Sequence, residues 1–191
     1  MTVLRGAAWA CALVAGSLVV AGCTPDEPEP TPTTPVETNT TSSAPETSEP
    51  TVAAPEMPAE AMQASAAGAQ AWVTHWFDLV NYAKATGDTQ PLKTFSGSAC
   101  KVCASTASDI DSNYADGGHM EGGEATVLSV LSPPPDSRNL VAVATTFTEA
   151  AATVVRANGS REPRNATPET RIDFVMVHEG GQWALREIGT P

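Results

Sequence analysis

The sequence predicts an α+β domain over residues 58–191, and two observations carry this prediction. Between Pro58 and Gly87, apolar residues recur at spacings of three and four, which is typical of an amphipathic helix. After Gly123 the spacing changes to two, which is typical of strands with one buried face. Helices followed by neighbouring strands give an α+β layout, and the region is long enough for one domain with its own core.

Residues 1–22 have the composition of an export signal. Arg5 is their only charged residue, and the apolar run at 7–20 is shorter than the roughly 20 residues of a membrane-spanning helix. Small residues precede Cys23, in a pattern that resembles the lipobox of bacterial lipoproteins. The resemblance implies cleavage before Cys23 and acylation of that residue, which would hold the protein on a membrane. An ordinary signal peptide or a retained helix are the alternatives.

Residues 23–57 form a segment rich in Pro, Thr, Ser, Glu and Ala, which we call the stalk. Positions 24–57 carry seven acids and no base, and eight prolines stiffen them. Such a composition buries too little apolar surface to fold, so we expect a disordered spacer. A ligand for proline-reading domains and an O-glycosylated tract remain open. The net charge of −12, without basic clusters, argues against a nucleic-acid partner.

Two helices are expected in the domain. The first runs for about 25 residues from Pro58 and ends near Gly87, where glycine favours a helix stop. A further turn is expected at 89–95, and the second helix at 100–114. The inner side of the first helix carries large apolar residues: Trp72, Val73, Trp76, Phe77 and Val80.

About four strands are expected after the helices. They are placed at Ala125–Leu131, Leu140–Arg156, Arg171–His178 and Gln182–Ile188. The second strand has small side chains at 149–152 that would allow a sharp bend. Gly180-Gly181 is a signal for a two-residue hairpin turn. The segments 117–123 and 158–168 are expected to be loops.

Three pieces of the domain together resemble an uncharacterised family of lipoproteins from high-GC Gram-positive bacteria. They are the segment from Thr86 to Leu92, the Cys100-Lys101-Val102-Cys103 element and the Gly181-Gln182-Trp183 hairpin. The resemblance implies a cone similar to nuclear transport factor 2, in which a curved sheet of about four strands wraps a long helix. It implies no activity.

Cys100 and Cys103 are expected to form a disulfide, because two cysteines remain outside the signal and lipid positions and disulfides persist outside the cytoplasm. A redox pair, a zinc site and free thiols are the alternatives. The three histidines show no spacing of metal ligands, so no metal or cofactor is expected.

Trp76, Tyr82 and Phe174 are candidates for lining a pocket, although inner aromatic residues are usually core. No catalytic set is predicted. The available ionisable groups are Tyr82, Tyr114, Asp78, Asp173 and His75, and the two aspartates are expected to face solvent.

These patterns lead to three hypotheses of function. The first is a non-enzymatic binding or accessory domain, anchored by lipid on the outer face of the cell membrane, for an envelope protein or a small apolar ligand. The second is a cone-fold enzyme of isomerase or dehydratase type acting on a small apolar substrate. The third is a structural component of an envelope complex.

Overall fold

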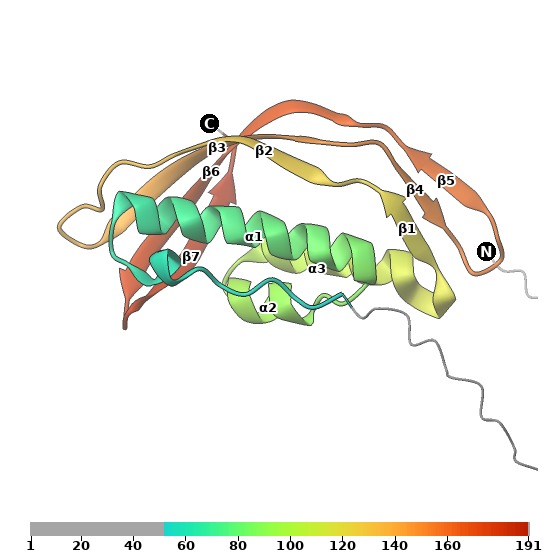
Figure 1. Cartoon of the computed structure of the whole chain (residues 1–191), viewed down its shortest axis with the longest axis horizontal. Helices are drawn as coiled ribbons and strands as arrows, with labels where there is room; N and C mark the ends of the chain where they lie inside the picture. The colour runs from blue at the N-terminus through green and yellow to red at the C-terminus, as the bar shows by residue number, and fades with distance from the viewer. Residues whose placement is uncertain (1–51, 191) are drawn as a thin grey trace, which may run out of the picture. The chain divides into compact units, whose positions relative to one another are not determined.

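The computed structural model describes residues 52–190, so the predicted signal segment, Cys23 and the stalk up to residue 51 lie outside the described residues. The described part is α+β, with three α-helices packed against antiparallel strands (Figure 1). Residues 52–57, expected to end the stalk, carry no helix or strand. None of the helices in this part combines the length and the apolar composition that a membrane-spanning helix needs.

The first helical region is divided into a short 3-10 helix and a long α-helix, where one continuous helix of about 25 residues was predicted. The 3-10 helix η1 spans Ala59–Met62, and α1 spans Ala66–Thr86. Ser65 separates them, because its hydroxyl accepts a hydrogen bond from Gly68 N at 3.0 Å and so caps α1. Gly87 ends α1 in the left-handed conformation, as predicted.

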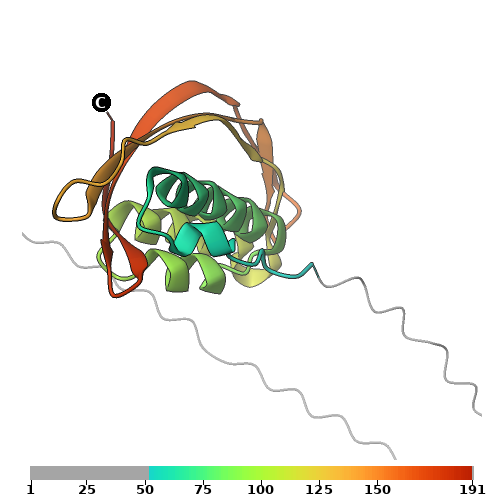
Figure 2. The same cartoon turned by 60° about the vertical axis from the view of Figure 1, so that its left-hand side comes forward.

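The next two helices lie side by side along α1, on the side away from the strands (Figure 2). Helix α2 spans Gln90–Ser96 and α3 spans Lys101–Tyr114. Asp111 of α3 joins them, because it accepts hydrogen bonds from Thr89 Oγ1 at 2.6 Å and from Lys93 Nζ at 2.7 Å. Cys100 caps α3 and forms a disulfide with Cys103, so the predicted pairing is present.

The strands form two antiparallel sheets, where a single sheet of about four strands was expected. One sheet has the order β2-β3-β6-β7, formed by Ala125–Leu131, Leu140–Glu149, Thr167–Glu179 and Gln182–Gly189. The other has the order β1-β4-β5, formed by His119–Gly122, Ala152–Val155 and Arg161–Arg164. The segments 117–123 and 158–168, predicted as loops, therefore contain strands β1 and β5. Their exposed, polar residues hide the apolar alternation from which strands are predicted.

The chain crosses between the two sheets three times. The strands that these crossings connect have the same lateral order in both sheets. β1 leads to β2, β3 to β4 and β5 to β6, across the short segments 122–125, 149–152 and 164–167. Gly122 lies at this bend with φ of 74°, and a Cβ there would come within 2.6 Å of Ala151 O. Small residues on both sides therefore permit the bend that was predicted at 149–152.

Helix α1 lies beneath the strands and forms the centre of the core. In Figure 2 the strands arch over α1, with α2 and α3 on the other side of it. Trp72, Val73 and Val80 of α1 are buried, and so are Val143 and Phe174 on the inner face of the sheet. The inner sides of α1 and the sheet therefore determine what space remains inside.

Candidate functional site

A partly open cavity of about 220 Å³ lies between α1, α3 and the inner face of the four-stranded sheet. We call it the apolar chamber. Helix α1 contributes one wall, the first turns of α3 a second, and all four strands of the sheet the third. Eight of its lining residues are apolar: Trp76, Phe77, Val80, Val102, Ala125, Phe147, Ile172 and Ile188.

One end of the chamber is polar and contains an ion pair. Lys84 Nζ donates a hydrogen bond to Glu149 Oε1 at 2.5 Å and another to Gly123 O at 2.9 Å. Glu149 Oε2 accepts from Thr167 Oγ1 at 3.0 Å. Buried charges in proteins are stable when they are paired and hydrogen-bonded in this way. The pair thus holds two charges at the edge of an apolar space at a defined position.

A second cavity of about 300 Å³ adjoins this end, because it shares Lys84, Thr106 and Glu149 with the chamber. We call it the polar annex. Hydroxyls, amides and charged groups line one part of it, where Arg164 donates to Asn113 Oδ1 at 3.2 Å, and apolar side chains, including Ile110 and Met120, line the rest. The chamber and the annex therefore adjoin each other at Lys84, Thr106 and Glu149, and most of the charged and amide groups lie on the side of the annex.

A surface groove of about 340 Å³ adjoins the chamber where the disulfide lies, and we call it the β7 groove. It shares Val102 and Ile188 with the chamber. Val102 is 42% exposed and lies between the two cysteines of the disulfide, so the disulfide fixes the turn of α3 that separates chamber from solvent. This side is the candidate entrance.

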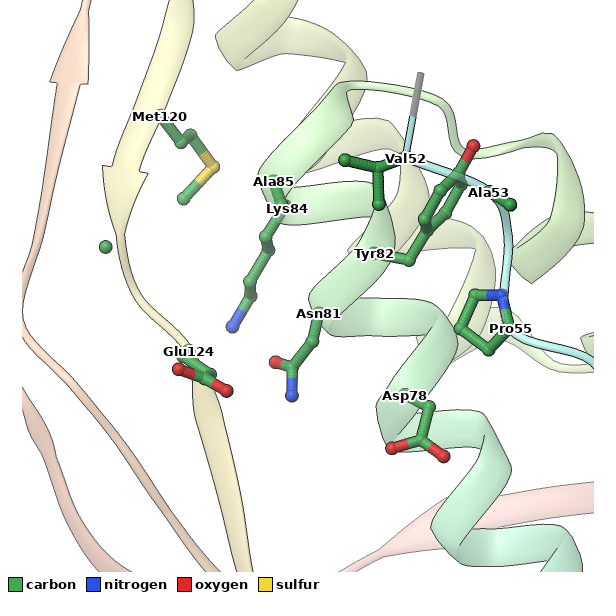
Figure 3. A pocket seen from close by; sticks show the side chains of 11 residues that line it. Val52, Ala53, Pro55, Asp78, Asn81, Tyr82, Lys84, Ala85, Met120 and Glu124 are labelled. Carbon is green, nitrogen blue, oxygen red and sulfur yellow. The ribbon is translucent and has the colours of Figure 1, made fainter. Parts of the chain in front are cut away.

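The largest cavity, about 690 Å³, is a groove along the outer side of α1. Figure 3 shows that Lys84 and Asn81 project from α1 toward the connection between β1 and β2 that carries Glu124, while Tyr82 lies beside Val52. We call it the α1 groove. Its lining includes Val52, Ala53 and Pro55 and mixes charged, amide and apolar side chains, so the apolar part of its surface is interrupted by charged groups that the apolar side of the chamber does not have.

The three predicted pocket-lining residues are placed in different surroundings. Trp76 lines the apolar chamber, and its Nε1 donates to Ser96 Oγ at 3.1 Å. Tyr82 lines the α1 groove and donates to Asp88 Oδ2 at 3.2 Å. Phe174 is fully buried against Trp76, with ring centroids 5.4 Å apart, and belongs to the core.

The other ionisable residues considered for catalysis do not face the chamber. Asp78 is exposed and lines the α1 groove. His75 is buried against Phe95, and burial lowers its pKa, an effect that the charge of Asp78 partly opposes. Asp173 is half-buried rather than exposed, with Arg171 Nε at 3.5 Å from its Oδ1.

Lys84 and Glu149 were not singled out from the sequence, although each continues an apolar row. Lys84 follows Trp76 and Val80 at intervals of four, so it lies on the same side of the helix. Glu149 follows Phe147 at an interval of two, on the same face of β3. A charged residue that continues an apolar row, at an interval of four in a helix or two in a strand, is the sequence signal from which this pair could have been predicted.

No group of three or more His, Cys, Asp or Glu side chains within residues 52–190 is arranged to hold a metal ion.

A family model described as "Family of unknown function (DUF6318)" matches residues 37–189. No curated protein matches the chain. Among the solved structures that are similar to this chain, two share low sequence identity with it, as follows. The intermembrane space region of chloroplast protein ARC6 shares 13% identity over 71% of this chain and 97% of that chain, with a TM-score of 0.44. Aln2 from a Streptomyces species shares 12% identity over 61% of this chain and 84% of that chain, with a TM-score of 0.39. Neither TM-score is high enough to assign a fold or an activity.

Proposed function

We propose that this chain, which belongs to the DUF6318 family of unknown function, is an extracytoplasmic lipoprotein whose domain binds a small, mainly apolar ligand. The observation that carries the binding proposal is the apolar chamber, which lies between α1, α3 and the sheet and has one polar end. Ligand sites are typically apolar cavities with a few convergent polar groups, and the chamber has this composition.

The location rests on the sequence. The small residues before Cys23 support acylation there, and the proline-rich stalk supports a spacer between the membrane and the domain. The domain would then stand at the outer face of the cell membrane, with its chamber available to molecules of the envelope.

A cone similar to nuclear transport factor 2 is the fold we propose for the two sheets together. The strand orders support this fold, because β1, β4 and β5 lie in the same lateral order as the strands β2, β3 and β6 to which they connect. In such a cone, the space between the long helix and the curved sheet is where a ligand would lie.

The two other hypotheses have less support. Tyr82 and Asp78 line the α1 groove and His75 is buried against Phe95, so the groups considered for catalysis are not gathered at the chamber. A purely structural domain needs no apolar cavity, and one of about 220 Å³ lies between α1, α3 and the sheet.

The test is binding of n-octanol to the full chain carrying Cys23→Ala, which keeps acyl chains off the protein. Calorimetry should show saturable binding of one molecule, and Val102→Trp should abolish it by filling the candidate entrance. Leu131→Trp is the matched control, because Leu131 is 65% exposed and lies on β2 outside the lining of the chamber. Equal binding by both variants would refute the chamber as the site.

A further inference from the structure

The size of the apolar chamber sets a limit on what it can hold alone. Its volume of about 220 Å³ is below the roughly 300–1,000 Å³ of ordinary ligand sites. The polar annex adds about 300 Å³ directly beyond Lys84, Thr106 and Glu149. Only a molecule that extends through both spaces uses a site of ordinary size, so the occupant needs an apolar body and a polar head.

The charged residues around the annex determine whether the polar head of the ligand can be charged. Lys84 and Arg164 are balanced by Glu149 and Asp109, so the lining has no excess charge. Lys84 and Glu149 already neutralise each other. A charged head would have to lose its water beside a pair whose opposite charge is already neutralised and whose like charge repels it, so its desolvation is only partly compensated.

The hydrogen-bonding groups at the junction fit an uncharged head. An ammonium group has three N–H donors, and two of those on Lys84 are used by Gly123 O and Glu149 Oε1. One donor therefore remains beside the junction. Thr106 is half-buried there, and its hydroxyl makes no hydrogen bond within residues 52–190. A head that both accepts and donates, such as a hydroxyl or an amide, satisfies both groups.

We propose that the ligand is an uncharged amphiphile, whose compact apolar body fills the chamber and whose hydroxyl-bearing or amide-bearing head lies in the annex against Lys84 and Thr106. The inference rests on the proposed binding function and names the chemical class of its ligand.

The test compares three probes that share one alkyl chain and differ in the head: octyl glucoside, octanoate and octylammonium. Each is titrated by calorimetry, below the concentration at which it forms micelles, into the full chain carrying Cys23→Ala. Octyl glucoside should bind about tenfold more tightly than either charged probe, which corresponds to one or two hydrogen bonds at the head. Thr106→Val should weaken octyl glucoside about fivefold and leave octylammonium unchanged. Thr126→Val, the same change at an exposed position of β2, should change neither affinity.

The outcomes separate this inference from the function on which it rests. If n-octanol binds in the chamber but octanoate or octylammonium binds as tightly as octyl glucoside, the inference is wrong and the binding function stands. If Thr106→Val binds octyl glucoside as tightly as the wild type does, the head does not lie against Thr106 and the inference is also wrong. If neither n-octanol nor any octyl probe binds, both are wrong.

Discussion

His75 is a buried ionisable side chain on the side of α1 that faces α2. Its ring packs edge-on against Phe95 with centroids 4.9 Å apart, and its Nδ1 makes no hydrogen bond within the described residues. Burial disfavours the charged imidazolium, so the pKa of His75 in the folded protein lies below the ordinary value. Asp78 opposes this shift only partly. The neutral ring is therefore the form that the folded protein accommodates.

This shift makes the stability of the protein depend on pH in a defined direction. As the pH falls below about 6.5, the unfolded chain binds a proton at His75 before the folded protein does. The stabilisation is fully present above that pH and is lost as the pH falls through the folded-state pKa. Denaturant unfolding between pH 5 and 8 should show this loss in the wild type and a flatter profile in His75→Leu.

Asp78→Asn should change the pH dependence of stability in the opposite direction to His75→Leu. Without the carboxylate, the pKa of His75 should fall further, and the loss of stability should continue to lower pH. Profiles of equal slope for the wild type and His75→Leu would contradict the assignment, whatever the absolute stability of the variant.

The polar end of the chamber shows what residue patterns can and cannot predict. The apolar side of α1 was predicted correctly, with Trp72 and Trp76 buried as expected. Lys84 was not counted with that apolar side, because its side chain is charged. Its partner Glu149 is 65 residues away and at the end of another apolar row, so only folding brings the two together. A contact between distant residues is not encoded by the period of either element.

At the scale of elements, the C-terminal end of α1 packs closely against the ring of Tyr114 in α3. Gly87 has φ of 78°, and a Cβ there would contact the ring of Tyr114. The Tyr114 hydroxyl donates to Lys84 O at 2.6 Å, so the ring connects α3 to the last turn of α1. Glycine is needed at this position for its backbone conformation and for the space that it leaves.

Replacing Gly87 by alanine should therefore cost more than the backbone conformation alone. Left-handed backbone costs a residue with a Cβ about 1–2 kcal/mol, and displacing Tyr114 should add about 1–3 kcal/mol to the loss of unfolding free energy. Gly181→Ala is the matched control, because Gly181 has φ of 83° but nothing within 4 Å of a Cβ. Equal losses in denaturant unfolding would mean that the Tyr114 contact contributes nothing.

The strands with one buried face could be predicted from the sequence. The strands with both faces exposed could not. β2, β6 and β7 agree with the predicted alternation, and the bend at 149–152 is present. β1 and β5 were missed, because every residue of β5 and most of β1 are exposed. Their strand conformation comes from pairing with β4, which lies far from β1 in the sequence. The division into two sheets depends on the same pairing and could not be predicted from local patterns.

At the scale of the whole molecule, the family match and the described domain differ in extent. The match begins at residue 37, whereas the first helix of the described part begins at Ala59. The match therefore extends beyond the folded domain into the proline-rich segment that we expect to be a stalk.

The proposed anchor leads to the last prediction. Acylation of Cys23 requires its thiol, so Cys23→Ala should prevent lipid attachment while leaving the domain unchanged. Two or more acyl chains hold a protein stably on a bilayer, whereas none would leave only the acidic stalk and domain, which have no basic cluster to bind anionic lipid. In fractionated cells of a Gram-positive host, the wild type should therefore sediment with membranes, and Cys23→Ala should move to the soluble or secreted fraction. Ala21→Ser, a change beside Cys23 that keeps a small residue before it, is the control and should stay with the membranes. Retention of Cys23→Ala on membranes would show that something other than this cysteine holds the protein there, and the domain would then have to be considered as a membrane-binding element itself.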